Sequence, residues 1–217
     1  RPDHPKVLAQ QAARYEREER FDEAEKVWLK LKKLSPEAES YWPLISHYKQ
    51  RGNWPALKQT YIELIQIPSP GLAQAQAAAE LAYALMDRQL WEEALPYAEV
   101  AAQTYSSWGL LCAADCYEGN GDRERAEQMV RAASERYDTL QGNWYLWCRR
   151  TGEGNVEAAR LLSDQFLERM ATEGDPDEYR LQRAVAWELA DDLERAYELD
   201  RVGTEALKSP FRPVHRL

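Results

Sequence analysis

The sequence predicts an all-α fold, an α-solenoid built from tandem antiparallel helical hairpins. Apolar residues recur at helical spacing in pairs of short segments, and Gly, Asn and Asp mark the turns between them. A small or apolar anchor also recurs every 32 to 37 residues, early in each second helix. The anchors are Ala24, Leu57, Ala94, Ala126, Ala159 and Ala196. Repetition at this period is typical of stacked two-helix units.

The first unit, about residues 5–37, shows the pattern most clearly. Leu8 and Ala12 lie on one stripe of a predicted helix, and Ala24 and Trp28 follow on a second helix after a short break. Small residues at the crossing let the two helices approach closely, and aromatic residues fill the space to the next hairpin. One hairpin cannot bury its apolar face alone, so we expect neighbouring hairpins to stack.

Five further units follow in order along the chain. We place them at about residues 38–71, 75–106, 107–138, 140–173 and 177–208, which makes one repeat domain over residues 1–208. Extra loops at Pro68–Gly71 and Glu173–Pro176 separate two pairs of units, but neither is long enough to be a free linker. Residues 209–217 form a tail with two prolines, which either covers the last hairpin or begins a further segment.

Cap residues support the predicted helix boundaries. Asp22 and Glu25 match a capping box at the start of a second helix. A side chain that can accept a backbone N–H bond stands before three later second helices: Asn53, Asp122 and Asn155. Gly52 and Gly121 precede two of these caps, where the end of a helix favours a left-handed residue.

The pattern resembles the tetratricopeptide repeat, a helix–turn–helix unit of about 34 residues. The resemblance covers nearly the whole chain, as about six units, and the first unit fits best. It implies a right-handed superhelix in which the first helices line a concave groove that binds a peptide or protein segment. Bulky Ile45, Leu57 and Trp147 stand where small residues are expected, so we expect less ideal hairpin packing in the second and fifth units.

The groove positions of the family, carried onto this sequence, give the candidate partner-binding residues. They are Trp42, Tyr83, Met86, Trp108, Leu111, Trp144 and Cys148. Aromatic residues there would provide a large contact area with little loss of entropy. Packing between hairpins is an equally good explanation for any one tryptophan, since the chain has 8 of them.

One ligand class known for the family does not fit this sequence. Members that grip acidic chaperone tails use Lys and Asn at defined groove positions. The corresponding residues here are Ala9, Ala13, Pro43, Gln76 and Glu80. A groove poor in Lys and Arg should not favour an acidic peptide.

Composition narrows the class of function further. The formal net charge of −9 argues against a nucleic-acid partner, because phosphate binding requires clustered Lys and Arg. No apolar run approaches the roughly 18 residues that a membrane-spanning helix needs. The cysteines form no Cys-x-x-Cys pair, so we expect Cys112 and Cys116 in the core of a cytoplasmic protein. A chain that begins at Arg1 is expected to be a processed product or an excised segment.

Catalysis and metal binding have no support in the sequence. Carboxylates are plentiful, but they fall in turns or on outward helical faces, where solvation and ion pairs explain them. The histidines lie far apart and no Cys/His cluster exists, so we expect no metal and no cofactor. An enzyme would need Asp115, Cys148 and His47 to converge, and nothing in the sequence predicts that they do.

The sequence therefore predicts a binding scaffold rather than an enzyme. The leading hypothesis is recognition of a protein or peptide partner through apolar and aromatic residues in the concave groove. The alternative is a structural subunit, or an interaction region of a larger assembly, that makes contact through its convex face or its terminal hairpins. A homo-oligomer and a larger complex both stay open, and the partner's identity is not predicted.

Overall fold

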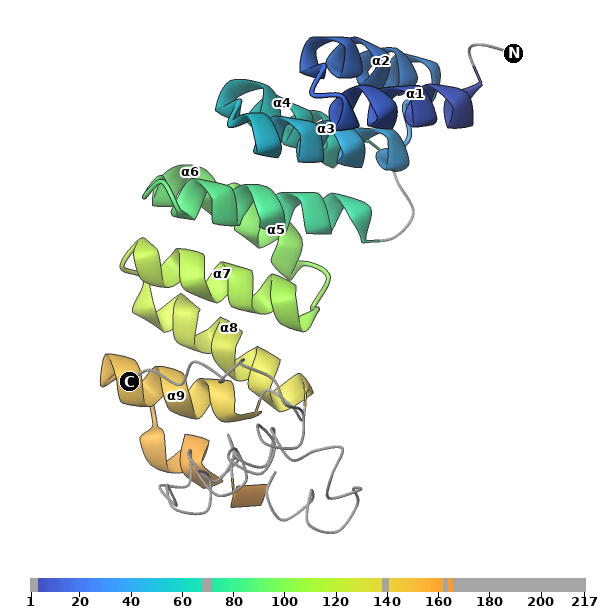
Figure 1. Ribbon diagram of the computed structural model, residues 1–217. Coiled ribbons are helices and arrows are strands. Elements are labelled where there is room, and N and C mark those ends of the chain that lie inside the picture. Colours follow the sequence, from blue (N-terminus) through green and yellow to red (C-terminus); the bar gives the residue numbers. More distant parts are fainter. Residues whose placement is uncertain (1–3, 68–71, 138–140, 162–163, 166–217) are drawn as a thin grey trace, which may run out of the picture. The chain divides into compact units, whose positions relative to one another are not determined.

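The computed structural model of the chain describes residues 4–67, 72–137, 141–161 and 164–165. All regular secondary structure in these residues is helical, which confirms the predicted all-α class (Figure 1). By internal contacts the chain divides into two compact units, residues 1–104 and 105–217. The predicted sixth hairpin at residues 177–208 and the tail at 209–217 lie outside the described residues, and the one-domain organisation stays a prediction.

The first unit is a row of three antiparallel hairpins. Its helices are α1 (Pro5–Arg17), α2 (Phe21–Leu34), α3 (Ala38–Arg51), α4 (Trp54–Ile65), α5 (Ala73–Met86) and α6 (Trp91–Ala102). Within the row α1 pairs with α2, α3 with α4 and α5 with α6, and consecutive hairpins meet through α2 and α3 and through α4 and α5. This is the arrangement that the repeated anchors predict.

The core of the first unit lies along the helix crossings. Ala12 and Ala24 are both fully buried where α1 meets α2, since neither side chain keeps the backbones apart. Ile45 and Leu57 occupy the corresponding region of the second hairpin and are 2% and 7% exposed. The helices α3 and α4 share a smaller contact than the helices of the other two hairpins, as these bulkier side chains predict.

The second unit repeats the same construction. Its described helices are α7 (Ser107–Gly119), α8 (Arg123–Arg136) and α9 (Gln141–Thr151), and residues 156–161 are helical again. The pair α7 and α8 forms a hairpin, and α9 packs on α8. Ala126 and Ala159 are fully buried, as expected for anchors at helix crossings.

The predicted caps are mostly present. Three side chains accept the expected backbone N–H bonds: Asn53 from Ala56, Asp122 from Arg125 and Asn155 from Ala158. Gly52 and Gly121 have φ angles of 63° and 81°, in the left-handed region as predicted. The capping box of Asp22 and Glu25 is wrong. The helix α2 begins at Phe21, which places Asp22 in its first turn rather than at its cap.

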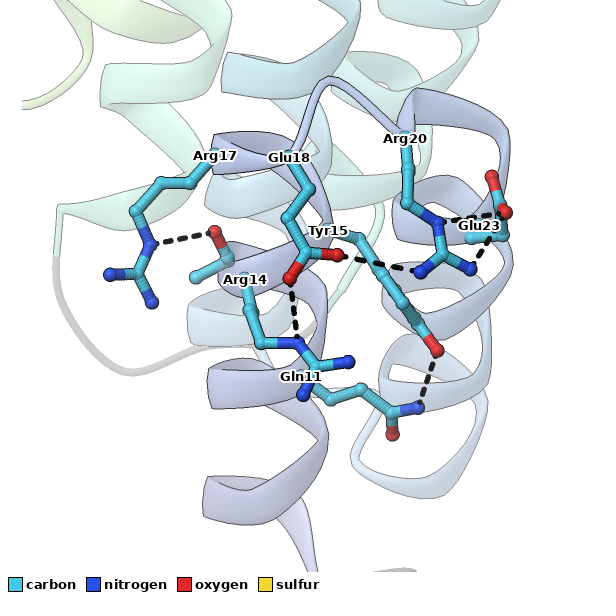
Figure 2. Close-up of polar contacts among 8 residues, drawn as sticks. Gln11, Arg14, Tyr15, Arg17, Glu18, Arg20 and Glu23 are labelled. Atoms are coloured by element: carbon cyan, nitrogen blue, oxygen red, sulfur yellow. Dashed lines mark hydrogen bonds and ion pairs between the residues drawn. The ribbon is translucent and has the colours of Figure 1, made fainter.

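A polar cluster replaces that capping box at the first turn. Figure 2 shows the Tyr15 hydroxyl accepting a hydrogen bond of 3.2 Å from Gln11, with the Arg20 guanidinium 4.5 Å from the centre of the Tyr15 ring. Arg20 in turn donates to Glu23 at 2.9 Å and to Glu18 at 3.4 Å. The turn between α1 and α2 is therefore held by a stacked arginine rather than by a side-chain cap.

Ion pairs about one repeat apart join neighbouring hairpins inside each unit. In the first unit Lys32 contacts Glu63 and Lys49 contacts Glu80, both at 2.7 Å. In the second unit the pairs are Arg123 with Glu153 and Arg150 with Glu118. The charges thus favour the order and register in which the hairpins stack.

Candidate functional site

The first helices of the hairpins leave one stripe uncovered. In the first unit the buried residues of α3 recur in α5 at a spacing of 37 residues. The pairs are Tyr41 and Ala78, Leu44 and Leu81, Ile45 and Ala82, and Tyr48 and Leu85. Between them, Ser46 and Tyr83 face away from the core, and the Tyr83 side chain is 40% exposed. The exposed stripe is thus fixed by what each helix must bury.

Two aromatic candidates lie on this stripe of the first unit. Trp42 is half-buried on α3, one turn before Ser46, and Tyr83 is exposed on α5. Lys49 at the end of α3 reaches Glu80 of α5 at 2.7 Å, so the two first helices lie side by side. Met86, a third candidate, is 6% exposed and packs in the core. The surface therefore offers Trp42 and Tyr83, with Met86 beneath it.

In the second unit the corresponding stripe of α7 holds two more candidates. Trp108 and Leu111 are half-buried, and Asp115 is exposed one turn beyond Leu111. These residues lie at i, i+3 and i+7 and so share one helical face. The stripe is apolar near the start of α7 and acidic near its end.

The last two candidates, Trp144 and Cys148 of α9, lie in the interior. Their side chains are 1% and 0% exposed. The Trp144 indole N–H donates to Glu127 at 3.2 Å, and the Arg131 guanidinium lies 4.8 Å from the centre of its ring. On α9 the exposed apolar residue is instead Leu146, at 46%.

A longer turn explains why sequence reasoning missed Leu146. Three residues separate α7 from α8, whereas four separate α9 from the helix that begins at residue 156. The burial pattern of α9 follows that of α7 at a spacing of 31, so that Leu146 corresponds to exposed Asp115. The caps Asp122 and Asn155 are 33 residues apart. Groove positions counted back from the second helix are therefore two residues too far along α9. The signal in the sequence was the pair of glycines at 152 and 154, both with positive φ.

Electrostatics distinguish Asp115 from its charged neighbours. Arg150 of α9 forms two hydrogen bonds to the Glu118 carboxylate, at 2.8 and 2.7 Å. Loss of solvation and the nearby Glu118 raise the pKa of the Asp115 carboxyl, and Arg150 offsets part of that effect. A carboxylate in this position is more costly to ionise than one in water.

The structure supplies no arrangement for catalysis in its described part. Among the residues described, no three His, Cys, Asp or Glu side chains lie close enough to hold a metal ion. Burial and Glu127 raise the pKa of the Cys148 thiol to about 11, which disfavours the thiolate that a nucleophile requires. His47 is 2% exposed and bonded to Glu16 at 3.1 Å. Each group is explained by packing.

Comparison with known proteins bears on the fold. No protein-family model and no curated protein matches the sequence. Solved structures do match it. MamA from Desulfovibrio magneticus RS-1 has a TM-score of 0.53 at 11% identity, over 79% of this chain and 97% of that one. PilF of Pseudomonas aeruginosa has a TM-score of 0.52 at 12% identity, over 94% and 92%. BtubC from P. vanneervenii has a TM-score of 0.56 at 15% identity, over 97% and 96%.

This chain has a tetratricopeptide-repeat-like fold. The similar structures share that repeat fold with it, at identities that carry the architecture alone. No helix among the described residues is both long and apolar enough to cross a bilayer. The tetratricopeptide-like stripe of Trp42, Tyr83, Trp108 and Leu111, with Leu146 added, is the candidate site, and its role in binding stays a prediction.

Proposed function

We propose that this tetratricopeptide-like chain is a protein-interaction scaffold that binds a peptide or protein segment through the exposed stripe of its first helices. The observation that carries this proposal is the apolar and aromatic content of that stripe. It holds Trp42 and Tyr83 in the first unit, and Trp108, Leu111 and Leu146 in the second. Side chains of this kind dominate binding energies at protein interfaces.

Paired substitutions in each unit test the proposal. Trp42→Ala with Tyr83→Ala changes the first unit, and Trp108→Ala with Leu146→Ala changes the second. Proteins captured from a lysate by the unchanged chain are identified by mass spectrometry, and each variant is then compared for the same partner. We expect at least one pair to weaken capture by tenfold or more, about 1.4 kcal/mol. Helical content by circular dichroism must stay unchanged.

Exposed leucines outside the stripe provide the matched control. Leu29 and Leu34 of α2 are 39% and 51% exposed and lie on a second helix. Replacing both with alanine removes a similar apolar area and should leave capture unchanged. Undiminished capture by both stripe variants would refute the proposal.

The same control tests the second candidate function. Exposed Leu29 and Leu34 are the observation that favours a structural subunit in contact through its second helices. Loss of capture by the leucine variant, with both stripe variants active, would support that alternative.

A further inference from the structure

Asp115 is an unpaired carboxylate on an otherwise apolar stripe. Trp108 and Leu111 precede it on the same face of α7, and its side chain is exposed. Among the described residues it has no hydrogen-bond or ion-pair partner. By contrast, the nearby Glu118 carboxylate is bound to Arg150 through both oxygens. Asp115 is therefore the acidic group of this surface that an incoming ligand can pair with.

The local charge balance favours a cation beside Asp115. Glu118 and Arg150 neutralise each other, so the three groups together carry one negative charge. Desolvation and Glu118 raise the pKa of Asp115, which means that its negative charge is poorly compensated there. A positive group brought next to the carboxylate would relieve this, whereas an acidic group would add repulsion.

The apolar side chains lie next to this carboxylate. The Glu118–Arg150 pair holds the ends of α7 and α9 together. Asp115 lies one turn before Glu118, and Leu146 lies one turn before Arg150, so both belong to the surface between the two helices. Leu146 is 46% exposed there. One ligand segment can thus contact an acidic group and an apolar side chain at once.

We infer that the α7–α9 surface binds a basic–apolar protein segment. A Lys or Arg side chain of that segment pairs with Asp115, while an apolar side chain packs against Trp108, Leu111 and Leu146. This inference rests on the proposed function and adds the charge of the partner to it. The two groups of contacts act differently, because apolar packing provides affinity and the carboxylate selects for a cation.

Synthetic peptides provide a direct test on the full 217-residue chain. Three fluorescent pools contain peptides of about nine residues, roughly 30 Å when extended. All three have Leu, Ile or Phe at two fixed positions and differ at one position between them, which holds Lys or Arg, Glu, or Gln. Binding is measured by fluorescence anisotropy. We expect the basic pool to bind about tenfold more tightly than the acidic pool, with the Gln pool between them.

Two substitutions assign this preference to Asp115. Asp115→Asn should weaken the basic pool about fivefold to tenfold and remove most of the difference between pools. Glu124→Gln removes one exposed negative charge from the first turn of α8 and should change binding by less than about twofold. Raising the ionic strength from about 0.1 M to about 1 M, which shortens the Debye length from about 10 to about 3 Å, should also reduce the preference.

The outcomes separate this inference from the proposed function. Equal binding of all three pools, unchanged by Asp115→Asn but weakened by Trp108→Ala, would overturn the basic preference and leave the apolar surface supported. Tighter binding of the acidic pool would overturn the inference as well. Binding of no pool to the unchanged chain would overturn the inference and count against the proposed function at this surface.

Discussion

The Tyr61 hydroxyl of α4 donates a hydrogen bond of 2.6 Å to the Glu80 carboxylate of α5. Tyr61 is fully buried at the junction between the second and third hairpins, and Glu80 also accepts a bond of 2.7 Å from Lys49. Burial and the neighbouring carboxylate raise the pKa of the Tyr61 phenol, so the hydroxyl stays protonated and acts as a donor. One glutamate thus joins three helices of the first unit.

Removing this hydroxyl should destabilise the first unit measurably. Tyr61→Phe keeps the buried ring but deletes the donor, and Glu80 keeps Lys49 as a partner. We expect the free energy of unfolding to fall by about 1–2 kcal/mol, as for other hydrogen bonds to charged groups. Urea denaturation followed by circular dichroism measures the change. Tyr97→Phe in α6 is the control, with an expected effect below about 0.5 kcal/mol; similar losses in both variants would contradict the assignment.

Two glycines in the turn after α9 should differ in their tolerance of a side chain. Gly152 and Gly154 have φ angles of 67° and 72°, so alanine is strained at both. A Cβ at residue 152 would meet nothing within 4 Å, whereas one at 154 would lie 2.6 Å from Glu127 Oε1 and 2.9 Å from Cys148 Sγ. We expect Gly152→Ala to cost about 1 kcal/mol and Gly154→Ala about 2–4 kcal/mol. Denaturant unfolding of the two variants provides the comparison, and equal costs would show that the close approach is absent.

Part of this architecture could be read from the sequence, because it follows from local chemistry. The anchors Ala24, Ala94 and Ala126 are fully buried, and Asn53 and Asp122 cap their helices as predicted. These features depend on residue size and on side-chain oxygens within a few residues of the backbone they serve.

The site was harder to predict, because it depends on register over a whole repeat. A turn one residue longer after α9 displaced the predicted positions, and Leu146 rather than Trp144 is exposed. The polar cluster around Tyr15 and Arg20 was also missed, since a stacked arginine at a turn has no fixed sequence spacing. Side-chain exposure depends on neighbouring hairpins, and the periodicity of one helix does not contain that information.

The raised pKa of Asp115 predicts how its replacement depends on pH. Because the folded state favours the protonated carboxyl, this group's contribution to stability is present below its ordinary pKa of about 3.9 and is lost as pH rises through the folded value. Asp115→Asn should therefore match the unchanged protein near pH 3 and be slightly more stable near pH 7. Denaturant unfolding across this range measures the difference. A variant less stable at neutral pH would mean that the carboxylate has a favourable partner, contrary to the proposed surface.

Trp144 and Leu146 should separate packing from surface exposure on the same helix. Trp144 is 1% exposed and its indole is bonded to Glu127, so Trp144→Ala leaves both a cavity and a carboxylate that has lost its donor. We expect a loss of about 3–5 kcal/mol in the free energy of unfolding. Leu146→Ala removes an exposed side chain and should cost less than about 0.5 kcal/mol. Chemical denaturation of each variant measures both values. If Trp144→Ala were as mild as Leu146→Ala, the register of α9 deduced from its burial pattern would be wrong, and Trp144 would return to the binding surface.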